Sequence, residues 1–93
     1  MSKLDLKNVS VISKDGVKHS TDDVYRSKEL LQFVNRFTIM NLLLQDSRHL
    51  IDLINNENST VVIDQKNDTV YLQNASTKLN DEFHSFFRNP NSF

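Results

Sequence analysis

The sequence contains no cysteine and no tryptophan, and it has one glycine and one proline among 93 residues. Without cysteine there can be no disulfide, no thiol nucleophile and no cysteine-ligated zinc site. The single glycine, Gly16, excludes glycine-rich phosphate-binding loops and the G-x-S-x-G elbow, because each needs several glycines. Small secreted domains usually depend on disulfides, so we expect a protein of the reducing cytoplasm.

An excess of charge and a long apolar run are also missing. Eleven Lys and Arg residues face twelve Asp and Glu residues, for a net charge of -1, so there is no overall attraction toward nucleic acid or a membrane surface. No apolar run approaches the roughly 18 residues of a membrane span. The first ten residues, "MSKLDLKNVS", lack an apolar segment, and we expect no signal peptide.

Metal and cofactor motifs are absent as well. The three histidines, at positions 19, 49 and 84, fall on three different predicted elements and lack the spacing of a metal site. Asp64 and Asp68 could suggest calcium, but an EF-hand loop would need a glycine and a glutamate where Thr69 and Ala75 stand. We therefore predict no catalytic residue, no metal, no cofactor and no enzymatic activity.

What is present is an apolar content of 38% beside 25% charged residues, which is typical of a folded protein. At this length we expect one domain, over residues 1–88, followed by a loose tail at 89–93 that begins near Pro90. The fold class that the patterns predict is α+β: a hairpin, one long or two consecutive helices, a second hairpin and a C-terminal helix. The hairpins would form an antiparallel sheet with the helices packed on one face.

The first hairpin comprises a strand at 4–12, a turn at 13–16 and a short strand at 17–19. Leu4 and Leu6 alternate with charged residues, but Val9 and Val11 fall on the opposite phase. Since side chains alternate strictly along a strand, we expect a bulge near residues 7–8 or a strand covered on both faces.

The helical region begins at residues 19–23, where Ser20 or Thr21 can act as a cap and two aspartates suit the first turn. Helical periodicity predicts a helix over 22–45 and a second over 47–55, with one continuous helix over 22–55 as the alternative. A last helix is predicted at 76–88, capped by Ser76 or Thr77.

The second hairpin, at 60–73, has the clearest pattern. A turn centred on Lys66 and Asn67 would place Ile63 opposite Val70, with Val62 opposite Tyr71 on the reverse face. The hairpin and helices together predict a core whose members are large and apolar: Phe33, Val34, Phe37, Val61, Ile63, Leu72 and Phe83.

The stretch "FTIMNLLLQDS" has apolar side chains around most of a helix. Either this helix is buried on all sides, or Ile39, Leu42 and Leu43, joined by Leu50 and Ile54, form an interface with another protein or a second copy of the chain. The sequence therefore favours a small protein-binding or regulatory module that self-associates, with a composition typical of phages and mobile elements.

The alternative function is a nucleic-acid-binding regulator that uses the lysines of the first hairpin, Lys3, Lys7, Lys14 and Lys18. A two-stranded ribbon that carries lysines can enter a groove of DNA. Lysines on an exposed hairpin also protect edge strands from aggregation, however, and the local excess of positive charge is small.

Overall fold

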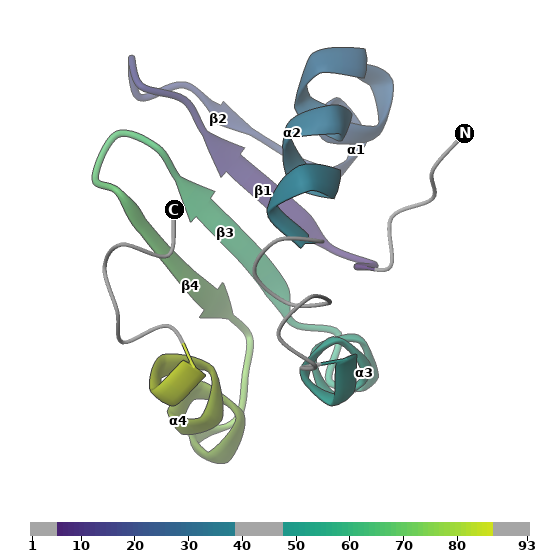
Figure 1. The fold of residues 1–93 in the computed structure, drawn as a ribbon, viewed down its shortest axis with the longest axis vertical. Coiled ribbons are helices and arrows are strands. Elements are labelled where there is room, and N and C mark those ends of the chain that lie inside the picture. The colour runs from purple at the N-terminus through teal and green to yellow at the C-terminus, as the bar shows by residue number, and fades with distance from the viewer. Residues whose placement is uncertain (1–5, 39–47, 87–93) are drawn as a thin grey trace.

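A computed structural model of the chain describes residues 6–38 and 48–86, which form four strands and four helices (Figure 1). Along the chain they are β1 (Val9–Ile12), β2 (Lys18–His19), α1 (Thr21–Arg26), α2 (Lys28–Thr38), α3 (Arg48–Asn56), β3 (Thr60–Asp64), β4 (Thr69–Gln73) and α4 (Thr77–Phe86). The predicted α+β class is confirmed.

The first strand changes phase at the place that the sequence indicated. Residues 7 and 8 form a bend, and the strand itself begins only at Val9. Because of this bend, Leu6 lies in the same hydrophobic core as Val9 and Val11 although it is an odd number of residues away. Within the described residues, the strand predicted at 4–12 is therefore shorter than predicted and begins at Val9.

The turn of the first hairpin depends on its glycine. The backbone N–H of Gly16 donates to the carbonyl of Ser13 over 2.9 Å, and Gly16 has a φ of 88°. This left-handed conformation strongly favours glycine, because a side chain would crowd the following carbonyl. The turn returns the chain to β2, which is only two residues long.

The predicted helix at 22–45 is interrupted, which corrects both that prediction and the alternative of one helix over 22–55. Ser20 begins α1 with a capping box, in which it exchanges hydrogen bonds with Asp23. Ser27 then leaves the helical conformation, with φ -101° and ψ 118°. Its own N–H donates to the last turn of α1, while its hydroxyl accepts the N–H of Leu30 over 3.2 Å and begins α2. Serine is favoured at helix caps because its side chain hydrogen-bonds to nearby backbone groups. Here one serine ends α1 and begins α2.

The predicted hairpin at 60–73 is confirmed in its register. Ile63 pairs with Val70, and Val62 pairs with Tyr71. The loop between the strands is held by Asp64, whose carboxylate accepts the backbone N–H of Asn67 over 3.1 Å and its side-chain amide over 2.8 Å. Asp68 follows in the left-handed region with a φ of 52°, a conformation that aspartate tolerates better than most residues.

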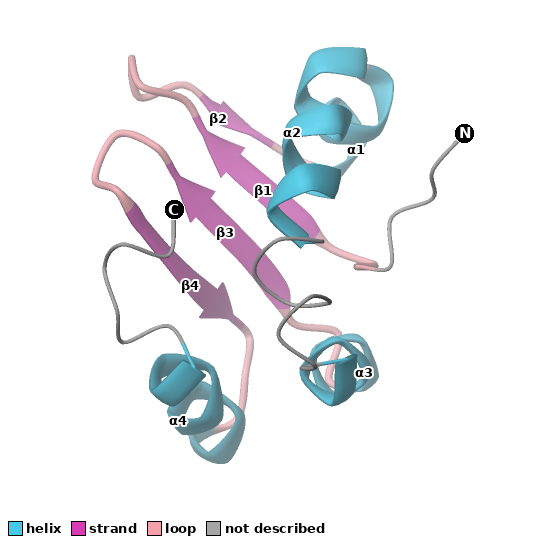
Figure 2. Cartoon of the chain, viewed as in Figure 1, coloured by secondary structure: helices cyan, strands magenta, loops and turns pink. Residues whose placement is uncertain are grey.

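The four strands form one mixed sheet in the order β2-β1-β3-β4 (Figure 2). The two hairpins are antiparallel, as predicted, but β1 and β3 run parallel, which corrects the prediction of a purely antiparallel sheet. The helices α1 to α3 form the connection between β1–β2 and β3, and a crossover of this kind can bring the second hairpin in beside the first in the parallel direction.

A single hydrophobic core joins the sheet to all four helices. One phase of the central strands supplies Val9, Val11, Val61 and Ile63, and the helices supply Val24, Val34, Phe37, Leu50, Ile51, Ile54, Leu79 and Phe83. Six of the seven predicted core residues are buried, whereas Phe33 is partly buried at the margin of the core. Val62, on the opposite phase of β3, is also fully buried.

Within residues 6–38 and 48–86, no helix is both long enough and apolar enough to cross a membrane.

Candidate functional site

The helices α3 and α4 run antiparallel beside each other and are tied together at one end. The carboxylate of Glu57, just after α3, accepts the backbone N–H of Ser76 over 2.8 Å and its hydroxyl over 2.9 Å. Ser76 in turn caps α4, because its hydroxyl oxygen accepts the N–H of Leu79 over 3.2 Å. The end of one helix is therefore fixed to the start of the other.

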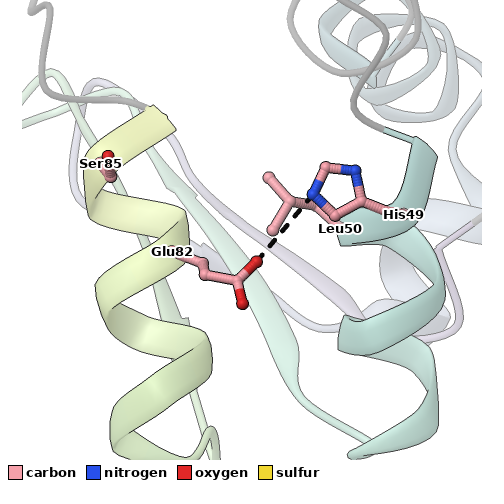
Figure 3. A pocket seen from close by; sticks show the side chains of 4 residues that line it. All are labelled: His49, Leu50, Glu82 and Ser85. Atoms are coloured by element: carbon pink, nitrogen blue, oxygen red, sulfur yellow. Dashed lines mark ion pairs between the residues drawn. The ribbon is translucent and has the colours of Figure 1, made fainter.

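Two adjoining hollows lie between these helices and form what we call the α3–α4 groove. The hollow nearer the start of α3, drawn in Figure 3, has a volume of about 360 Å³ and is lined by His49, Leu50, Glu82 and Ser85. The second has a volume of about 280 Å³ and is lined by Leu53, Glu57, Ser76, Lys78, Leu79 and Glu82. Glu82 lines both hollows.

The groove has an apolar floor and one exposed apolar wall. Leu50 and Leu79 line it but are almost completely buried, each with 2% of its surface exposed. Leu53, one of the few large apolar side chains exposed in the described parts of the chain, retains 36%. An apolar side chain of a partner could therefore cover Leu53 without any change in the core.

A weak polar bridge crosses the groove. The Nε2 atom of His49 lies 3.9 Å from a carboxylate oxygen of Glu82, as Figure 3 shows. The His49 side chain is 66% exposed, and exposed pairs at this separation stabilise a fold by about 0–1 kcal/mol. The bridge can therefore be replaced by a partner at little cost.

The same residues do not have the geometry of a nucleophilic triad, although serine, histidine and glutamate all line the first hollow. Catalysis of that kind needs a hydrogen bond of about 2.6–3.2 Å between the serine hydroxyl and the imidazole. No such bond joins Ser85 to His49, and Figure 3 shows Ser85 on α4, across the hollow from the histidine ring.

The charge of the two helices is mildly acidic. The two helices, with Glu57, carry two basic side chains, Arg48 and Lys78. They carry four acidic side chains, which are Asp52, Glu57, Asp81 and Glu82. Without the histidines, these side chains carry a net charge of -2.

The predicted interface residues do not come together as a described surface. Leu50 and Ile54 are core residues, with 2% and 0% of their surfaces exposed, so they do not form an exposed patch. The reason is that α3 presents Leu50, Ile51 and Ile54 to the core on one face. Ile39, Leu42 and Leu43 lie outside the described residues.

The predicted nucleic-acid lysines are divided between two ends of the sheet. Lys7, in the bend before β1, donates from its ammonium group to the side-chain oxygen of Asn58 over 3.1 Å. Lys14 and Lys18 belong to the other end, where Lys66 of the second hairpin lies against Gly16. Lys3 lies outside the described residues.

The charges around those hairpin tips cancel. Residues 13–18 and 64–68 together hold three lysines and three aspartates. Asp15, whose pKa is lowered chiefly by a hydrogen bond from the Ser13 hydroxyl, remains anionic at neutral pH. The structure therefore brings a third lysine, Lys66, to this end without creating a local excess of positive charge.

The sequence pattern did contain a signal for the groove. Apolar residues occupy four of the five positions from 50 to 54, which is more than one face of a helix can direct into a core. Leu53 is the member that faces outward, and it borders the groove. No group of three or more His, Asp or Glu side chains that could hold a metal ion occurs within residues 6–38 and 48–86.

The groove must be interpreted from its own residues. No protein-family model, curated protein or solved structure matches this chain.

Proposed function

We propose that this chain is a small, non-enzymatic protein-binding module that receives an amphipathic helix of its partner in the α3–α4 groove. The observation that carries the proposal is Leu53, a large apolar side chain that is 36% exposed beside a depression floored by Leu50 and Leu79. Helices that dock into a groove between two others use this combination of an apolar floor and a polar rim.

The partner helix would place one apolar residue against Leu53 and a basic residue near Glu82. Glu82 lies at the junction of the two hollows and is only weakly paired with His49 across 3.9 Å. A lysine or arginine of the partner could take the place of the imidazole. The net acidic charge of the two helices also favours a basic partner.

Two synthetic peptides test this proposal. One is a 14-residue amphipathic helix built only of leucine and lysine, and the other replaces every lysine with glutamate. In a titration followed by amide chemical shifts, we expect the lysine peptide to bind at least tenfold more tightly than the glutamate peptide, with shifts concentrated at residues 49, 53, 82 and 85.

Two matched variants locate the binding surface. Leu53→Ser should weaken the lysine peptide about five- to tenfold, because about 1 kcal/mol of apolar contact is lost. Val17→Ser is the control, since Val17 is 49% exposed but belongs to the first hairpin. If Leu53→Ser did not weaken binding, if both variants weakened it equally, or if the shifts were spread over the whole chain, the groove would not be the binding site.

A further inference from the structure

The strand β4 forms one edge of the sheet. It pairs with β3 on one side, and no other strand of the described chain lies on its other side (Figure 2). Its ends are sharply defined, because Asp68 before it and Asn74 after it both have positive φ angles, of 52° and 60°. The available edge is therefore the five residues Thr69–Gln73.

The two edges of this sheet differ in how well they are protected. At the opposite edge β2 is two residues long and carries Lys18, and both shortness and lysine discourage strand addition. The strand β4 is five residues long and has no side chain that is charged at neutral pH. Its sequence, "TVYLQ", is also rich in residues that favour strands. By this comparison β4 is the edge at which another strand can be added.

The sequence of β4 is chemically symmetric about its centre. Read in either direction, it runs polar, aliphatic, tyrosine, aliphatic, polar. Two copies placed antiparallel in the register centred on Tyr71 would therefore match like with like at every position. This is also the one register that pairs all five residues of both strands.

We propose that β4 pairs with the β4 strand of a second copy of this chain, antiparallel and centred on Tyr71, so that two four-stranded sheets join into one of eight strands. Thr69 then lies opposite the partner's Gln73, Val70 opposite the partner's Leu72, and the two tyrosines face each other. Because the pairing is two-fold symmetric, it covers the β4 edge on both chains, and only the two short β2 edges remain at the ends of the joined sheet.

The side chains support this pairing on both faces of the sheet. Val70 and Leu72 already belong to or border the hydrophobic core, so the aliphatic pairs would extend it across the two-fold axis. Tyr71 lies on the reverse face beside Val62 and is partly exposed. Aromatic pairs directly opposite each other across antiparallel strands are favourable.

A charge-swap experiment tests both the partner and the register. In Tyr71→Lys, and separately in Tyr71→Glu, like charges would face each other across the axis, and we expect the dimer dissociation constant in sedimentation velocity to rise at least tenfold. An equimolar mixture of the two variants should restore association to within a few-fold of the wild type, because opposite charges then face each other. Thermal melts establish that each variant is folded.

The end positions provide a second test if position 71 does not tolerate charge. Thr69 and Gln73 are both exposed, so the double variant Thr69→Lys, Gln73→Lys and its glutamate counterpart should remain folded. They should again separate alone and associate when mixed. A monomeric wild type would overturn the proposal, and so would a failure of both mixtures to associate.

Two controls separate this edge from other surfaces. Leu53→Ser should leave the dimer unchanged, and Tyr71→Lys should leave binding of the leucine–lysine peptide unchanged. The proposal for the groove and the proposal for the β4 edge can therefore fail independently. The double variant Leu42→Glu, Leu43→Lys addresses the leucine-rich segment that the sequence favoured. A dimer that is lost in this variant but kept in Tyr71→Lys would overturn the pairing through β4.

Discussion

Glu57 and Ser76 join two helices through one carboxylate, which accepts both the N–H and the hydroxyl of the serine over 2.8 and 2.9 Å. The serine is at the same time the cap of α4. Glu57, just beyond the end of α3, thus fixes the start of α4 beside it, at one end of the groove.

Replacing Glu57 with alanine should lower the free energy of unfolding by about 1–2 kcal/mol, because two charge-assisted hydrogen bonds at a helix start are lost. Urea denaturation measures the change. Gln32→Ala, an exposed substitution on α2, is the control and should stay within about 0.5 kcal/mol of the wild type. A Glu57→Ala variant as stable as that control would mean that Ser76 caps α4 without help from α3.

The break between α1 and α2 depends on Ser27. Replacing it with alanine removes the hydroxyl that accepts the N–H of Leu30, and we expect a loss of about 1 kcal/mol in thermal or urea denaturation. Ser85→Ala, on the exposed side of α4, is the matched control. If Ser27→Ala were instead more stable than the wild type, the two helices would have merged into one, as their periodicity alone predicts.

Local patterns predicted some elements well and others poorly, for physical reasons. The β3–β4 hairpin is specified by neighbours in the sequence, since alternation and the Asp64–Asn67 turn favour the same register. The parallel pairing of β1 with β3 joins residues about fifty positions apart, and nothing local distinguishes it from an antiparallel arrangement.

Neither the shared cap at Ser27 nor the exposed side of α3 in the candidate site could be predicted from the sequence. Ser27 has the spacing of a helix interior, so its role as a shared cap is visible only in its backbone angles. Leu50, Ile51, Leu53 and Ile54 are equally apolar, and the sequence could not tell which of them faces the core. Packing buries Leu50, Ile51 and Ile54 and leaves Leu53 exposed, so Leu50 and Ile54, which the sequence placed in an interface, are core residues.

The core prediction can be tested at Phe37, which has 6% of its surface exposed. Truncation to alanine should destabilise the fold by about 3–5 kcal/mol, as loss of a buried aromatic side chain does. On a domain of this size such a loss can approach the whole stability, so the variant should melt far below the wild type or be unfolded at room temperature.

Phe33 supplies the comparison, because it packs at the margin of the core and is only partly buried. Phe33→Ala should therefore lower the free energy of unfolding clearly less than Phe37→Ala does, when both variants are measured by calorimetry. The reverse order would mean that α2 is rotated relative to the arrangement described.

The last prediction concerns acid. The hydrogen bonds that Asn67 donates to the Asp64 carboxylate lower the pKa of Asp64. Protonation removes the negative charge that strengthens these bonds. A carboxyl group whose pKa is lower in the folded state stabilises the fold above its unfolded pKa of about 3.9. That contribution is lost as the pH falls through the folded pKa.

Asp64→Asn should therefore be less stable than the wild type at pH 7, and the difference should shrink below about pH 4. Urea denaturation at several pH values measures it, with Asp52→Asn, an exposed substitution on α3, as the matched control. If both variants showed the same dependence on pH, the overall charge of the chain, rather than the contact between Asp64 and Asn67, would be responsible.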